Sequence, residues 1–178
     1  MIILTFASFA SFSQVRIKVK VENHQDSIYY LLKYKSDRSH SIIDTSSIST
    51  DYRIFDNKDN YEEGIYIVAD SRQNPLFEVL LGKDQTFSIH VEELMDLKSY
   101  KVKGCKENEL YLEYQKRNKE SKQLTRQYEK EIKEFPQQKD SLSYLIKATK
   151  AKFNQYQNEF FKNNPNNLMT SLLLSMQN

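Results

Sequence analysis

Apolar and polar residues alternate strictly at the start of the chain, over residues 15–22. The apolar positions are Val15, Ile17, Val19 and Val21, with charged residues between them. A period of two places the four apolar side chains on one face of a β-strand. Turn-forming residues follow at 23–27, and residues 28–34 are again rich in apolar side chains. We therefore expect these first two strands to pair as a β-hairpin.

Short apolar segments continue at regular spacing as far as Gly104. The further predicted strands are residues 41–48, 52–55, 64–69, 76–81, 86–91 and 100–102. Turn-forming residues at 56–60, 73–75 and 82–84 separate several of them. About eight short strands with this spacing predict an antiparallel β-sandwich or barrel-like sheet over residues 14–104.

The period of the apolar residues changes to that of a helix after Gly104. Residues 106–135 contain no Gly or Pro, and their stripe is Leu110, Tyr114, Leu124, Tyr128, Ile132 and Phe135, with Arg117 and Ser121 in the same row. Pro136 ends this helix, and Asp140 is the expected N-cap of the next. The second stripe is Leu142, Ile146, Thr149, Phe153, Tyr156 and Phe160. The two helices predict an antiparallel helical hairpin.

A short third helix is predicted after the Asn- and Pro-rich break at residues 163–167. One face of this helix holds Leu168, Leu172 and Met176, and the sequence ends at Asn178. Because little of the chain remains to cover that face, we expect the helical region, residues 105–178, to be truncated before a further domain. The predicted fold class is α+β, with the strands first and the helices second.

Composition and charge exclude some classes of partner. The net charge of +2 gives no electrostatic reason to expect a nucleic-acid partner. Residues 106–162 carry 13 basic and 9 acidic side chains, which we interpret as a solvated helical surface. The apolar stretch at residues 2–12 is shorter than the ~20 residues that a membrane span needs. We therefore expect no membrane span.

The first residues have the pattern of an export signal. Residues 1–13 are uncharged and have the length of a signal-peptide core, and Ser11 and Ser13 precede a plausible cut before Gln14. A positively charged start is missing, so we interpret residues 1–13 as a signal-peptide remnant. The protein is then exported, to the periplasm or the cell envelope. The alternative is a buried first strand.

Cys105 is the only cysteine, so the chain has no internal disulfide and no Cys-x-x-Cys pair. It stands before a predicted helix with Lys103 and Lys106 beside it, and both features lower the pKa of a thiol. No histidine or second cysteine is close in the sequence. We interpret Cys105 as a small residue that fills a strand–helix junction, and a reactive thiol is the alternative.

Other candidate chemistry is sparse. The histidines His24, His40 and His90 share no metal-ligand spacing, and we expect His90 to face solvent. The acidic residues of one loop, which could collect Ca²⁺, do not follow the EF-hand pattern; they are Asp56, Asp59, Glu62 and Glu63. Three glycines cannot form a phosphate-binding loop. We predict no catalytic, cofactor-binding or metal-binding residues.

Six aromatic side chains of the predicted strands could form a platform that stacks on sugar rings. They are Tyr29, Tyr30, Tyr34, Tyr52, Phe55 and Tyr66. Packing across neighbouring strands in the core is the simpler interpretation of the same residues.

The order of several short motifs resembles a known module. The motifs are Asp26-Ser27-Ile28-Tyr29-Tyr30, Asp44-Thr45, Asp51-Tyr52-Arg53-Ile54-Phe55, Gly64-Ile65-Tyr66, Gln85-Thr86-Phe87-Ser88-Ile89 and Val102-Lys103-Gly104-Cys105-Lys106-Glu107-Asn108, followed by a helix with Tyr114. They resemble the N-terminal domain of unknown function that precedes a thioredoxin-like domain in exported Bacteroidetes proteins, which are similar to thiol:disulfide interchange proteins. The resemblance covers residues 15–176.

The resemblance implies a non-catalytic accessory module of a thiol-disulfide oxidoreductase. In that family the redox Cys-x-x-Cys lies in the C-terminal domain, and no residue of this chain matches it. The implied partner is the chain's own missing thioredoxin-like domain or another envelope protein, and the helices could also form a homodimer. The alternative is a free-standing extracytoplasmic binding protein with a ligand or glycan site on its sheet. A peroxidase with Cys105 as its one cysteine is the weakest hypothesis, because no Thr, Pro and Arg set surrounds it.

Overall fold

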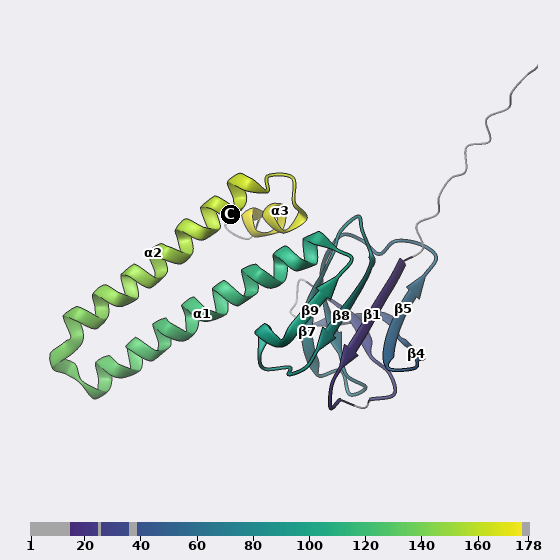
Figure 1. Cartoon of the computed structure of the whole chain (residues 1–178), viewed down its shortest axis with the longest axis horizontal. Coiled ribbons are helices and arrows are strands. Elements are labelled where there is room, and N and C mark those ends of the chain that lie inside the picture. Colours follow the sequence, from purple (N-terminus) through teal and green to yellow (C-terminus); the bar gives the residue numbers. More distant parts are fainter. Residues whose placement is uncertain (1–14, 25, 36–38, 176–178) are drawn as a thin grey trace, which may run out of the picture.

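The computed structural model describes residues 15–24, 26–35 and 39–175, and it confirms the α+β fold (Figure 1). Two sheets come first, and a long helical hairpin and a short third helix follow. The strands are β1 Val15–Val21, β2 Tyr30–Tyr34, β3 His40–Thr45, β4 Ser47–Ser49, β5 Tyr52–Asn57, β6 Gly64–Ala69, β7 Pro75–Leu81, β8 Thr86–Val91 and β9 Tyr100–Lys103. The predicted signal segment 1–13 and Met176 lie outside the described residues.

The predicted hairpin of the first two strands is wrong. The strand order is β4-β5-β1-β8-β9 in one sheet and β3-β2-β6-β7 in the other, so β1 and β2 belong to different sheets. β1 pairs antiparallel with β5 and parallel with β8. The physical reason is that both strands contribute buried apolar side chains to one core, from opposite sheets. Ile17 and Leu31 are both completely buried, and they pack in the same core between the sheets.

The strand predicted over residues 41–48 is two strands in two sheets, which brings the total among the described residues to nine. β3 pairs with β2, whereas β4 pairs with β5. The buried Ser46 stands at the corner between them, and its hydroxyl accepts a hydrogen bond of 2.8 Å from the backbone N–H of Tyr29. A side chain thus satisfies a buried backbone group where strand pairing is interrupted.

The main core lies between the two sheets, and the start of the first helix closes one side of it. This helix, α1 (Lys106–Glu134), packs against β7 and β9, which are edge strands of the two sheets. Cys105 and Leu112 therefore belong to the same hydrophobic cluster as the sheet residues. The sandwich and the beginning of the helical region are packed as one structure.

The helical hairpin is confirmed, with a correction at the turn. The short 3₁₀ helices are η1 Leu97–Ser99 and η2 Pro136–Gln138, and the second long helix is α2 Lys139–Asn163. α2 begins at Lys139 with Gln138 at the N-cap position, so the predicted capping role of Asp140 is wrong. The 3₁₀ turn η2 leads directly into α2, and Asp140 consequently lies in its first turn.

Aromatic side chains hold the base of the hairpin together. The ring of Tyr114 lies 5.6 Å from that of Phe153 and 6.0 Å from that of Phe160, measured between centroids. The third helix, α3 (Leu168–Ser175), folds back on this base, and its Met169 is fully buried there. No helix among the described residues combines the length and the hydropathy that a membrane span requires.

Candidate functional site

The junction between β9 and α1 places Cys105 in the protein interior. Gly104 has a φ of +93°, and a Cβ at this position would lie 3.2 Å from the carbonyl oxygen of Thr86, so glycine suits the turn. Cys105 follows in an extended conformation at the N-cap of α1 and is 2% exposed. Its sulfur lies 3.7 Å from the Asp84 carbonyl oxygen and 3.4 Å from Nδ2 of Asn108.

In the described part of the chain, no hydrogen bond joins the lysines beside Cys105 to its sulfur. Lys103 and Lys106 are both exposed, and Lys106 forms an ion pair of 3.1 Å with Glu109. The strand–helix position predicted for Cys105 is confirmed. A buried sulfur favours the interpretation as a small junction residue, because thiol exchange needs access to the thiolate. The reactivity of the thiol stays a prediction.

Asn108, which sequence reasoning missed, fixes α1 to the sheet. Its side-chain amide donates to the backbone carbonyl oxygen of Leu80 (2.6 Å), and its Oδ1 accepts from the N–H of Leu80 (2.9 Å). Leu80 belongs to β7, an edge strand, so its outward backbone groups have no strand partner. The side-chain amide of Asn108 pairs with these two backbone groups as a neighbouring strand would.

The three histidines lie in separate environments. The ring of His40 packs on that of Tyr34 with centroids 4.7 Å apart, and Nε2 of His90 lies 2.7 Å from Oε1 of Glu22. The side chain of His90 is 32% exposed, so it is partly solvated at the sheet surface.

The side chain of His24 lies close to the carboxylates of Asp26 and Asp70. One nitrogen or oxygen atom from each of the three residues lies within 4.8 Å of the other two, a spacing that could hold a metal ion. This group was not predicted, because Asp70 is distant from His24 and Asp26 along the chain. However, Asp26 already accepts hydrogen bonds from the backbone and hydroxyl of Ser71, which lower the pKa of Asp26. The carboxylate of Asp70 accepts hydrogen bonds from the backbone N–H and the side-chain amide of Asn74. Asp26 therefore joins its loop to the loop 70–74, whereas Asp70 stabilises the turn of that second loop from within.

The other sequence candidates are dispersed. Among the described residues, the acidic loop forms no group with metal-binding geometry, and its Glu62 pairs with Lys33. The six aromatic residues do not share a surface. Tyr29, Phe55 and Tyr66 are buried in the core, which leaves them unable to stack on a ligand.

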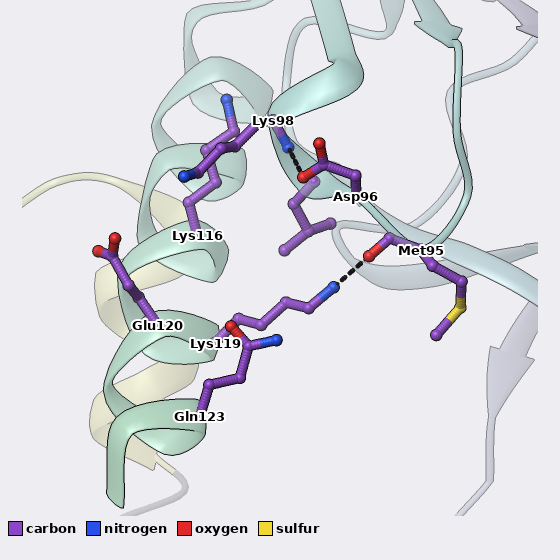
Figure 2. A pocket seen from close by; sticks show the side chains of 8 residues that line it. Met95, Asp96, Lys98, Lys116, Lys119, Glu120 and Gln123 are labelled. Carbon is purple, nitrogen blue, oxygen red and sulfur yellow. Dashed lines mark hydrogen bonds between the residues drawn. The ribbon is translucent and has the colours of Figure 1, made fainter. Parts of the chain in front are cut away.

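The helical half of the molecule contains a cleft between α1 and the preceding loop, of about 340 Å³ (Figure 2). Its lining residues are Met95, Asp96, Leu97, Lys98, Lys116, Lys119, Glu120 and Gln123. The loop is held in place by its own hydrogen bonds. Asp96 accepts from the N–H of Lys98 (3.0 Å), and the hydroxyl of Tyr100 donates to the carbonyl oxygen of Leu94 (2.8 Å). The Lys119 ammonium donates across the cleft to the carbonyl oxygen of Met95 (2.5 Å).

A second hollow, of about 490 Å³, adjoins the first and shares Leu97, Lys119 and Gln123 with it. Its remaining lining residues are Ile65, Glu78, Tyr111, Tyr114, Gln115, Asn118, Lys122, Arg126 and Leu173. Glu78 accepts from the hydroxyl of Tyr111 (2.7 Å) and from Nε2 of Gln115 (3.1 Å). Burial and the Glu78 carboxylate raise the pKa of Tyr111, so its hydroxyl stays a donor.

We name the two hollows together the basic groove, after the cations in their walls. These cations are Lys98, Lys116, Lys119, Lys122 and Arg126. The sequence analysis interpreted the lysines of this helix as an ordinary solvated face. The loop 94–98 makes them one wall of a groove, and its contact with α1 could not be read from periodicity. No protein-family model, curated protein or solved structure matches this chain.

Proposed function

We propose that this chain is a non-catalytic interaction module of an exported thioredoxin-like protein, and that it docks through its helical hairpin. One observation carries the proposal: the hairpin projects away from the sandwich (Figure 1), and large apolar side chains towards its tip are exposed. Towards its tip, Phe135 is 45%, Tyr144 71% and Leu145 40% exposed. Two helices alone bury little surface, and in this proposal the partner supplies the third element that covers these side chains.

The resemblance of the sequence motifs supplies the identity of the partner in this proposal. It is the thioredoxin-like domain or an envelope protein, and the sequence pattern of residues 1–13 supports an exported compartment. The burial of Cys105 supports an accessory role, since a redox nucleophile must reach its substrate. A glycan site on the sheet has less support, because Tyr29, Phe55 and Tyr66 point into the core.

The absence of catalysis is tested with the reduction of insulin disulfides by dithiothreitol. We expect the chain and its Cys105→Ser variant to give the same rate as buffer. Turnover by the chain that disappears in Cys105→Ser would overturn the proposal.

The docking role is tested first by reading the DNA downstream of this chain and then by expressing a longer protein. The DNA that follows the codon of Asn178 is read, and a continuous frame that encodes a Cys-x-x-Cys domain is expressed together with this chain. We expect slower amide hydrogen exchange over the tip of the hairpin in the longer protein, and loss of that protection in Tyr144→Glu but not in Lys150→Glu. A stop codon followed by an unrelated gene would contradict the proposal.

A further inference from the structure

We infer that the basic groove binds an acidic peptide segment of a partner protein. The inference rests on the proposed role as an interaction module, but it concerns a surface separate from the tip of the hairpin. The groove runs along α1 beside the sandwich, between that helix, the loop 94–98 and α3. The nature of the ligand is inferred from the cations of the groove, from their spacing along α1 and from the other lining residues.

The cations of the groove have no ion-pair partner among the described residues. Elsewhere on α1, Lys106, Arg117 and Lys130 each form an ion pair with a glutamate of the same helix. By contrast, the cations that line the groove form no ion pair in the described part of the chain; they are Lys98, Lys116, Lys119, Lys122 and Arg126. Solvated cations that converge on one cleft attract an anionic partner and raise its association rate.

The spacing of the cations favours an extended ligand over a single anion. Lys116, Lys119 and Arg126 lie on one face of α1, and at 1.5 Å per residue the first and last are about 15 Å apart along the axis. One phosphate or carboxylate needs donors that converge on a point. An extended peptide rises about 3.3 Å per residue, so four or five residues span about the same length.

The other lining groups favour a peptide over a nucleic acid. The half-buried Ile65, Leu97 and Leu173 provide apolar contacts for side chains. The side-chain amides of Gln115, Asn118 and Gln123 can pair with a peptide backbone.

The groove exists before a ligand arrives. Figure 2 shows the Lys119 side chain reaching from α1 to the carbonyl group of Met95, with Lys98 and Lys116 on one side of it and Gln123 on the other. This contact ties the loop to the helix and fixes the width of the cleft. A preformed site lowers the ordering cost of binding. Met95, which is 79% exposed, adds an apolar contact at the rim.

The test measures fluorescence anisotropy of a labelled peptide of alternating Glu and Leu, about five residues long to span the groove. We expect saturable binding that weakens with salt, and no binding of the same peptide with Gln in place of Glu. The double variant Lys116→Glu/Lys122→Glu should weaken binding by about tenfold or more. The control, Lys147→Glu/Lys150→Glu, makes the same charge change on α2 outside the groove and should retain the wild-type affinity.

Three results would overturn the inference: equal weakening in the control variant, equal binding of the Gln peptide, or tighter binding of single-stranded DNA than of the acidic peptide. Circular dichroism of each variant verifies that the fold is retained. Failure here is distinguishable from failure of the docking role, because that role is read from the protection of the hairpin tip and the Tyr144→Glu variant.

Discussion

Asn108 offers a direct test of how the helical region is attached to the sandwich. It is 3% exposed and lies in the first turn of α1, where its side chain pairs with both backbone groups of Leu80 on the edge strand β7. Replacing Asn108 with Ala removes both hydrogen bonds and keeps the helix propensity high. The N–H and C=O of Leu80 then have no protein partner at this edge.

The expected cost follows from the number of groups left unpaired. A buried polar group without a partner costs about 1–3 kcal/mol. Two such groups on Leu80 give about 2–4 kcal/mol, after allowing for partial access of water to the space that the amide leaves. Since single domains are stable by about 5–15 kcal/mol in all, the loss is a large fraction of the total.

Urea unfolding followed by circular dichroism measures this cost by linear extrapolation. The control is Glu129→Ala, an exposed position in the same helix, which should change the free energy of unfolding by less than about 0.5 kcal/mol. A loss below about 1 kcal/mol in Asn108→Ala would show that the amide does not complete the edge of the sheet. A second transition would show that the helices had separated from the sandwich.

Other perturbations address the thiol, the hairpin, the third helix and alkaline pH. Cys105 should react with a thiol reagent about 100-fold more slowly in the native protein than in urea, and comparable rates would contradict its burial. Ser121→Leu should raise the free energy of unfolding by about 1 kcal/mol, because Ser121 lines a hollow of about 240 Å³ between α1 and α2. Met169→Ala should lower it by about 2–5 kcal/mol in urea unfolding, since the side chain is fully buried. Burial raises the pKa of Tyr100 to about 12, so the unfolded chain loses its proton first, at about pH 10. The contribution of Tyr100 to stability should therefore be complete below pH 10 and be lost as the pH rises from 10 to 12. Stability over that range should fall less steeply in Tyr100→Phe, as read from urea midpoints.

Periodicity predicted which segments are strands and helices but not how the strands pair. The alternation in β1 and the helical stripe around Tyr114 follow from local sequence, and both were confirmed. The pairing of β1 with β8 was missed, because a parallel partner lies far along the chain and leaves no local pattern. The corner at Ser46 was missed because residues 41–48 contain no Gly or Pro.

The buried amides could not be predicted for a related reason. Asn108 and Gln85 each pair with both backbone groups of a distant residue, Leu80 at a separation of 28 residues and Tyr61 at 24. A polar residue in a predicted turn or first helical turn is normally solvated, so nothing in the sequence marks these two. The basic groove escaped prediction similarly, since the loop that forms its other wall precedes the helix and has no apolar period.

The central position of β1 affects how the protein folds as it is synthesised. β1 leaves the ribosome before the other strands described here, yet it lies between β5 and β8 in its sheet. Its parallel neighbour emerges only after the hairpin of β6 and β7, which can pair locally. Until residues 86–91 have left the ribosome, β1 can therefore be paired along one edge at most, and its apolar face stays incompletely covered. During that interval a delay in translation would expose an open strand edge, and any factor that shields nascent chains would act there.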